Sequence, residues 1–209
     1  MQTRIVTTVL AAVVLIAAAC SSDSSTGTAQ MGTLQVQLTD APFSTDSVSR
    51  VDVFVVRVDA KQAESDSAEA ARGASDDSAS ANGWTTIATP KQKIELLALR
   101  NGLSTVLGDK SVTAGSYRSF RLVIDPAQSS VTLKNGLVLT STSSPSVSFP
   151  SAARSGIKVQ LDQPITVGAG AMTKVLIDFD VAKSFVLRGN SLAQNGLLFK
   201  PVIKGTVKI

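Results

Sequence analysis

Short stretches in which apolar and polar residues alternate constrain the fold of this chain more than any other feature. In "GTLQVQLTDAP", residues 32–42, the side chains of Leu34, Val36 and Leu38 face one way and polar side chains face the other. A period of two is typical of a strand with one buried face. Similar runs recur to the end of the chain between Gly, Asn and Pro residues, and strong helical periodicity appears nowhere. The sequence therefore predicts an all-β, antiparallel β-sandwich similar to prealbumin-like or immunoglobulin-like domains.

Individual segments give more specific expectations. Residues 48–60 are expected to form a central strand, because both faces of that run become apolar in its middle. Asn135-Gly136 lies between two strand-like runs and predicts a hairpin with a two-residue turn. By contrast, "LSTVLGD", residues 103–109, is expected to form one turn of helix.

Residues 60–83, "AKQAESDSAEAARGASDDSASANG", have a different composition. They are mostly Ala, Ser and acidic residues, and alanine is their only apolar residue type. Such a segment cannot bury enough apolar surface to fold by itself, so we expect a long disordered surface loop. It is interpreted as an insertion without function, with a binding lid as the alternative.

The N-terminal segment predicts export and attachment to a membrane. "MQTR" is followed by the apolar run "IVTTVLAAVVLIAAA" and then by Cys20, the single cysteine of the chain. This resembles a bacterial lipoprotein signal, although Ala17 stands where leucine is usual. We expect residues 1–19 to be a signal peptide, Cys20 to be acylated, residues 20–31 to be a flexible tether and residues 32–209 to be a single domain. The alternatives are secretion with cleavage after Ala19, or an uncleaved membrane anchor.

Composition excludes several kinds of chemistry. The chain has no histidine and one cysteine, which rules out histidine-based triads, an intramolecular disulfide and a thiolate metal cluster. We expect no cofactor. The net charge of +4 favours weak contact with an anionic membrane or envelope polysaccharide. Nucleic acid is not an expected partner, because basic and aromatic residues do not cluster.

Three carboxylates and one tryptophan are candidate site residues. Asp178 and Asp180 are two positions apart in a predicted strand, so both should point to one face, roughly 7 Å apart. They could bind Ca²⁺ with help from Asp40, or act as the acid and base of a glycosidase. The other interpretation is structural, with Asp178 and Asp180 accepting hydrogen bonds and Asp40 capping a turn. Trp84 could stack on a sugar if it is exposed, or belong to the core.

Several segments, taken in order, resemble one known family. They are "LTDAP" at 38–42, "IELLALRNG" at 94–102, "LGD" at 107–109, "AGSYRSFRLVI" at 114–124, "VLIDFDVAKS" at 175–184 and "LFKPVIK" at 198–204. Together they are similar to the bacterial lipoprotein domain of unknown function 4382 (DUF4382), over residues 32–209. The resemblance implies an extracytoplasmic β-sandwich module and assigns no catalytic residues.

These observations lead to one main hypothesis about function. The chain is expected to be a non-enzymatic, lipid-anchored module of the cell envelope that binds a partner protein or an envelope glycan. Ser21 beside the cysteine resembles the sorting signal for the outer membrane, if the source is Gram-negative. A carboxylate-dependent glycoside hydrolase and a calcium-stabilised structural spacer are the alternatives.

Overall fold

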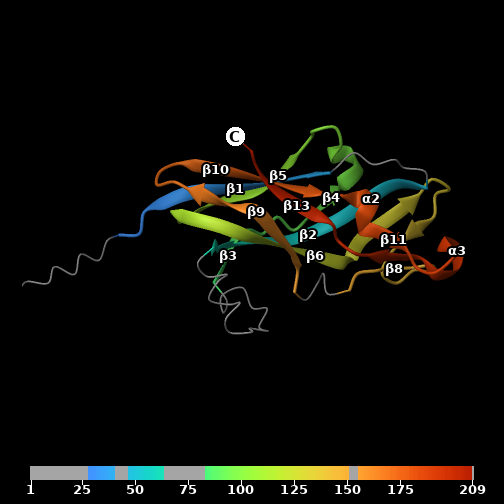
Figure 1. Ribbon diagram of the computed structural model, residues 1–209. Helices are drawn as coiled ribbons and strands as arrows, with labels where there is room; N and C mark the ends of the chain where they lie inside the picture. The colour runs from blue at the N-terminus through green and yellow to red at the C-terminus, as the bar shows by residue number, and fades with distance from the viewer. Residues whose placement is uncertain (1–27, 41–46, 64–82, 151–154, 209) are drawn as a thin grey trace, which may run out of the picture.

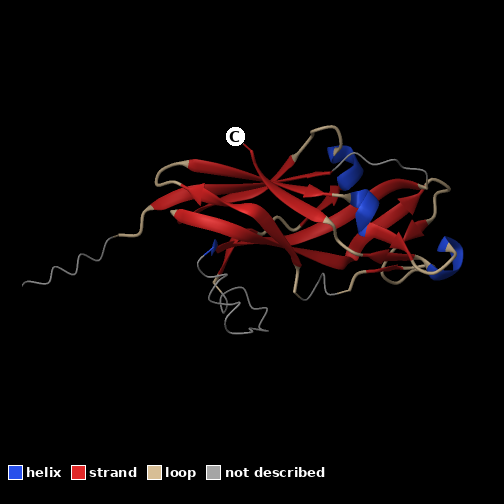
Figure 2. Cartoon of the chain, viewed as in Figure 1, coloured by secondary structure: helices blue, strands red, loops and turns tan. Residues whose placement is uncertain are grey.

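The computed structural model describes residues 28–40, 47–63, 83–150 and 155–208, and most of these residues lie in strands (Figures 1 and 2). Two sheets pack face to face around one hydrophobic core, and a third, small sheet lies at one end. The predicted all-β sandwich is therefore confirmed.

The first sheet has four strands in the order β13-β10-β1-β5. Their bounds are Ile203–Lys208, Met172–Phe179, Met31–Asp40 and Thr105–Thr113. β1 forms as its alternation predicts, with Leu34, Val36 and Leu38 fully buried. β1 and β10 are parallel, so Asp40 and Phe179 end the two strands side by side. The ends of two strands that are far apart in sequence thus form a single corner.

The second sheet is built on two long strands, β2 (Val48–Gln62) and β6 (Gly115–Leu133). Around them lie β3 (Trp84–Ala88), β4 (Gln92–Glu95), β7 (Val138–Leu139) and β9 (Ile157–Val167). β2 is central, as expected. Its pairing with β6 shifts between Val55 and Arg57. This β-bulge moves the core-facing side chains from Val51, Val53 and Val55 to Val58 and Ala60, which explains why both faces of the strand are apolar.

Short elements close one end of the sandwich. The 3-10 helix η1 (Leu96–Leu99) buries Leu96 and Leu97 beside β1 and β2. The small sheet has the order β11-β12-β8. Its strands are β11 (Phe185–Leu187), β12 (Leu197–Phe199) and β8 (Val147–Ser148). Two short helices lie nearby, α2 (Val181–Ser184) and α3 (Leu192–Asn195). Phe199 of β12 contacts the rings of Phe149, Phe179 and Phe185, which ties this sheet to the core.

Three local expectations were wrong. Residues 103–109 do not form a helical turn. They lead into β5, and the helical turn lies earlier, at η1. The β6–β7 hairpin has a three-residue turn, because Leu133 N–H bonds to Leu137 and Gly136 adopts a positive φ. The expected loop begins too early at 60, since β2 runs to Gln62; residues 64–82 lie outside the described residues.

Candidate functional site

The predicted site residues fall in two places. Asp40, Asp178 and Asp180, here called the acidic corner, lie where β1 and β10 end. Trp84 lies in β3 of the other sheet. Cys20 lies outside the described residues.

Asp40 is a buried carboxyl group with one bonded oxygen. It has the same alternation as Leu38, so it faces the interior at the end of the core, and it is 3% exposed. Oδ1 accepts the N–H of Val181 at 3.2 Å, whereas Oδ2 is buried without a hydrogen-bond partner. Burial raises the pKa of Asp40 to about 7; the Val181 bond works against this, and the charges of Asp178 and Asp180 add to it. This carboxyl group therefore titrates near neutral pH.

Asp178 points away from the core. The side chains of Ile177 and Phe179 on either side of it are buried, so Asp178 lies on the outer face of the sheet. Its Oδ1 is buried without a hydrogen-bond partner. Partial burial and then the charge of Asp180 raise the pKa of Asp178, and Lys204 on β13 opposes this rise.

Asp180 is bound within α2. It lies beyond the end of β10 and caps α2, where its side chain accepts the N–H of Lys183 at 3.0 Å and the Lys183 Nζ at 2.6 Å. Although partial burial acts in the opposite direction, these bonds lower the pKa of Asp180. This matches the structural interpretation of the residue, in which it accepts bonds from a lysine and a turn amide.

The three carboxylates of the acidic corner are near one another but do not converge. Asp40 faces the core, Asp178 faces outward and Asp180 faces the start of α2. Among the residues that the structure describes, no group of three or more His, Cys, Asp or Glu is arranged to hold a metal ion. A glycosidase needs two carboxyl groups that both reach the substrate, and Asp180 is already bonded to Lys183.

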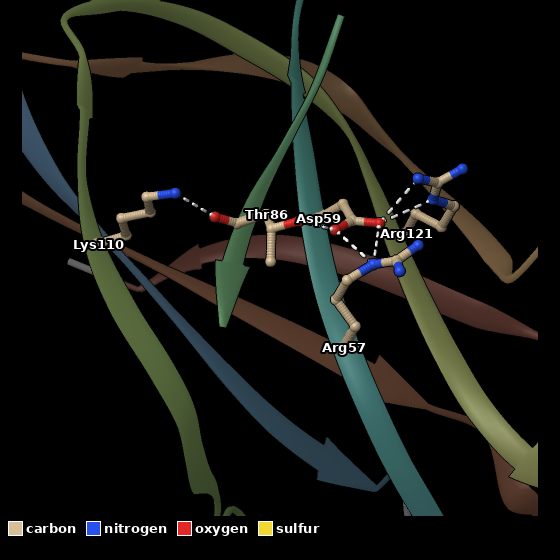
Figure 3. A network of polar contacts seen from close by, with 5 residues as sticks. All are labelled: Arg57, Asp59, Thr86, Lys110 and Arg121. Carbon is tan, nitrogen blue, oxygen red and sulfur yellow. Dashed lines mark hydrogen bonds and ion pairs between the residues drawn. The ribbon is translucent and has the colours of Figure 1, made fainter. Parts of the chain in front are cut away.

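Trp84 lies beside a buried ion network that the sequence did not lead us to expect. Figure 3 shows this network, centred on Asp59. Val58 and Ala60 belong to the core, so Arg57, Asp59 and Lys61 lie on the opposite face of β2. Asp59 is paired with Arg121 of β6 on one side and with Thr86 of β3 on the other. These four residues of three adjacent strands, Arg57, Asp59, Thr86 and Arg121, are called the Asp59 network below.

Every oxygen of Asp59 is bonded. Oδ1 accepts Arg57 Nε and Thr86 Oγ1 at 2.9 and 2.8 Å, and Oδ2 accepts Arg121 Nε at 2.9 Å and is 2.9 Å from its Nη2. Asp59 is fully buried and Arg121 is 1% exposed. A charge without contact to water is stable only when it is paired and hydrogen-bonded, as Asp59 is.

Trp84 is buried against the cations on this face. The guanidinium carbon of Arg121 is 4.7 Å and the Lys61 Nζ 5.7 Å from the ring centroid of Trp84. Trp84 is 8% exposed and therefore buried, although it is not part of the hydrophobic cluster that contains Val58 and Ala60. In this arrangement its ring contacts protein cations, and little of it is open to a sugar.

One sequence signal could have indicated the Asp59 network. Arg57, Asp59 and Lys61 alternate with Val58 and Ala60, a pattern that places three charges on one face of a strand. Lys61 and Arg121 each also make at least one further contact of this polar or electrostatic kind.

The fold defines a class of protein, an all-β sandwich domain. Residues 31–201 match the family described as "Domain of unknown function (DUF4382)", and the chain belongs to this family. The resemblance to this domain family is thereby confirmed, and the lipid anchor stays a prediction. No curated protein and no solved structure shows significant similarity to the chain. No helix within the described ranges is long and apolar enough to cross a bilayer.

Proposed function

We propose that the chain is a lipid-anchored module of the cell envelope that binds a partner protein or an envelope glycan and catalyses no reaction. The anchor is the acylated Cys20, which follows the apolar run of the signal segment. The acidic corner supports a role without catalysis, because Asp180 is occupied by α2 and Lys183.

The polarity of the sandwich is the observation that carries this proposal. The chain enters the domain at Met31, at one end of β1, and η1, α2 and β11 lie at the opposite end (Figure 1). A domain attached through Cys20 therefore presents that opposite end, called the distal end below, to the envelope space.

An exposed apolar edge gives the distal end a candidate binding surface. β11 is the edge of the small sheet, and Val186 and Leu187 are 41% and 49% exposed. Arg188 follows directly and is also exposed. In an antiparallel pair, alternate residues direct their backbone N–H and C=O groups away from the neighbouring strand. In β11 these groups are the C=O of Phe185 and the N–H and C=O of Leu187. An extended partner segment could therefore pair with this edge.

The anchor is tested by the mass of the mature N-terminus. We expect the full chain, produced in a bacterial host with its own signal, to begin at an acylated Cys20. The Cys20→Ser variant should lose the acyl chains and its stable attachment to membranes. Recovery of the unmodified chain from Met1 in the cytoplasm would contradict the proposal.

Binding is tested with the acylated full chain in vesicles, by envelope cross-linking and by glycan arrays. A Val186→Asp/Leu187→Asp variant should lose the captured partner. Val138→Asp is the matched control, because Val138 is 47% exposed and lies on β7 of the other sheet. Failure to capture any protein or glycan would count against a binding module, and equal loss in both variants would count against β11.

One observation favours the glycoside hydrolase alternative. The environments of Asp178 and Asp180 shift their pKa values in opposite directions, as the acid and the nucleophile of such enzymes require. Activity on any envelope polysaccharide that the Asp178→Asn/Asp180→Asn double variant abolishes would establish the alternative. For the calcium-stabilised spacer, a melting temperature lowered by a chelator would be the supporting result.

A further inference from the structure

The end of the sandwich at which the chain enters the domain is poor in charged side chains. Three described segments meet there: residues 28–33 before and within β1, the β5–β6 turn at 112–117, and the β9–β10 turn at 166–173 (Figure 1). Within these described segments no residue is charged, although 17% of the whole chain is. The surface formed by these three segments is called the entry tip.

Two methionines project from the entry tip. The sequence has three methionines, and the two beyond Met1 are Met31 and Met172. They are 46% and 57% exposed, and Met172 is paired with Thr33, two residues from Met31. Apart from the initiating residue, every methionine of the chain is therefore exposed at this one end.

The backbone holds both methionines in place. Gly170 N–H donates to Met31 O and Thr33 N–H to Ala171 O, each at 2.8 Å, and Ala114 N–H donates to Gln30 O at 2.6 Å. The entry segment is thus bonded to both neighbouring turns. These bonds fix the backbone near both methionines and so set the direction in which each side chain leaves its strand.

We propose that the entry tip contacts the surface of the lipid bilayer that holds the acyl anchor, with Met31 and Met172 inserted among the lipid headgroups. This inference rests on the proposed acylation of Cys20. Unbranched methionine side chains adapt well to irregular apolar surroundings. An uncharged surface with exposed apolar side chains also enters the bilayer interface without burying a charge.

The length of the tether selects the bilayer as the occupant of this surface. The eleven residues 20–30 separate the anchor from Met31. A chain of eleven residues reaches at most about 40 Å even when it is fully extended. The entry tip would therefore be at an effective concentration of about millimolar near the membrane, at which even a weak contact forms.

Charged side chains begin a short distance away. Lys110 lies two residues before residue 112, and Arg118 and Lys174 directly follow residues 117 and 173; all three are exposed. Lys174 is about 7 Å along β10 from Met172. The long stems of these side chains let their charged ends stay in water when the tip is at headgroup depth. The contact would be shallow and would orient β11 away from the membrane.

Oxidation of the native methionines tests the proposal. The acylated full chain is placed in vesicles of phosphatidylethanolamine and phosphatidylglycerol and treated with hydrogen peroxide, and sulfoxide formation is followed by peptide mass spectrometry. A Leu187→Met variant supplies an internal reference, since Leu187 is 49% exposed at the distal end. We expect Met31 and Met172 to oxidise about tenfold more slowly than the introduced methionine.

The outcomes separate this inference from the proposed function. If Cys20 is acylated and all three methionines oxidise equally fast, the anchor stands and the inference is overturned. If Cys20 is not acylated, the proposed function fails. In that case the inference survives only if adding vesicles to the chain still protects Met31 and Met172.

A charge placed at the entry tip sharpens the test. Ala169 is exposed in the β9–β10 turn, so Ala169→Glu should leave the fold intact and weaken the contact. Oxidation of Met172 in vesicles should then accelerate several-fold, and the matched distal variant Leu137→Glu should not change it. An unchanged rate in Ala169→Glu would contradict the proposal.

Discussion

Asp59 and Asp40 are both buried carboxylates, but their surroundings are opposite. Asp59 is 0% exposed and is bonded by two arginines and a threonine. Asp40 is 3% exposed, has a single backbone donor and lies near two other carboxylates. The comparison shows that two equally buried carboxyl groups can differ widely in the number of donors that face them.

The difference follows from the positions of the two residues in their sheets. Asp59 lies in the middle of β2, where the neighbouring strands bring Thr86 and Arg121 to its sides. Asp40 ends β1, beside Phe179 of β10, and only the start of α2 reaches it. A central strand supplies partners on both sides, whereas a strand end supplies few.

Asp59→Asn tests the fully hydrogen-bonded carboxylate of the pair and should have the largest effect on stability. The amide cannot balance the buried guanidinium group of Arg121 and the half-buried one of Arg57, so we expect a loss of about 3–5 kcal/mol in the free energy of unfolding. Urea denaturation followed by circular dichroism measures it. The control is Asp162→Asn, an exposed site where the change should be within about 0.5 kcal/mol. Similar values for both variants would contradict the structural role of the network.

Asp40→Asn tests whether the poorly bonded carboxyl group of Asp40 makes the stability of the chain depend on pH. The pKa of Asp40 is 3.8 in its ordinary state and about 7 in the folded chain, so the native state binds a proton that the unfolded state has lost between these values. Stability should therefore fall as pH rises from about 4 to about 7, by at most about 4 kcal/mol, and then level off. Asp40→Asn should remove most of this slope.

Urea midpoints at about pH 5 and about pH 8 measure that slope. The raised pKa of Asp178 contributes in the same direction, whereas the stability that the lowered pKa of Asp180 supplies is already complete above the ordinary value of 3.8 and is lost only at lower pH. A wild-type chain that is more stable at the higher pH would show that Asp40 is ionised throughout. The surroundings of Asp40 would then not have the effect on its pKa that sets it apart from Asp59.

The sequence predicts strands better than it predicts their neighbours. Alternation in β1 was sufficient to place Leu34, Val36 and Leu38 in the core, because the period of two depends only on local geometry. The pairing of Asp59 with Arg121 depends on the register of two strands more than sixty residues apart, which no local pattern specifies. The bulge between Val55 and Arg57 could not be predicted from the sequence either. It changes which residues of β2 face the core, so the face on which Asp59 lies could not be predicted.

The candidate carboxylates show the same limit. The spacing of Asp178 and Asp180 predicts a shared face only if the strand continues to Asp180. In the structure β10 ends at Phe179, and Asp180 turns to cap α2. A cap residue followed by Lys three positions later was visible in the sequence, but the strand pattern before it was stronger. The burial of Asp40 depends on what packs over the end of β1, which is tertiary information.

A smaller effect is expected from Asp180→Ala. The change removes the cap of α2 and the partner of Lys183, and the loss of a capping side chain costs about 1 kcal/mol. Thermal unfolding at neutral pH measures the loss. Asp180→Asn should retain much of the stability, since an asparagine oxygen can still accept the Lys183 N–H. If both variants were destabilised by several times this amount, Asp180 would have a larger role than a cap.

The smallest effect concerns the coupling between the carboxylates of the acidic corner. The negative charge of Asp178 helps to raise the pKa of Asp40, so Asp178→Asn should lower the pKa of Asp40 from about 7 by a fraction of a unit. Carbon-detected NMR titration of the Asp40 carboxyl measures this directly, with Asp162→Asn as the control that leaves it unchanged. Since burial is the main cause of the raised pKa, most of the shift should remain in Asp178→Asn. A return to the ordinary value of 3.8 would instead make repulsion by the charge of Asp178, rather than burial, the dominant cause of the raised pKa of Asp40.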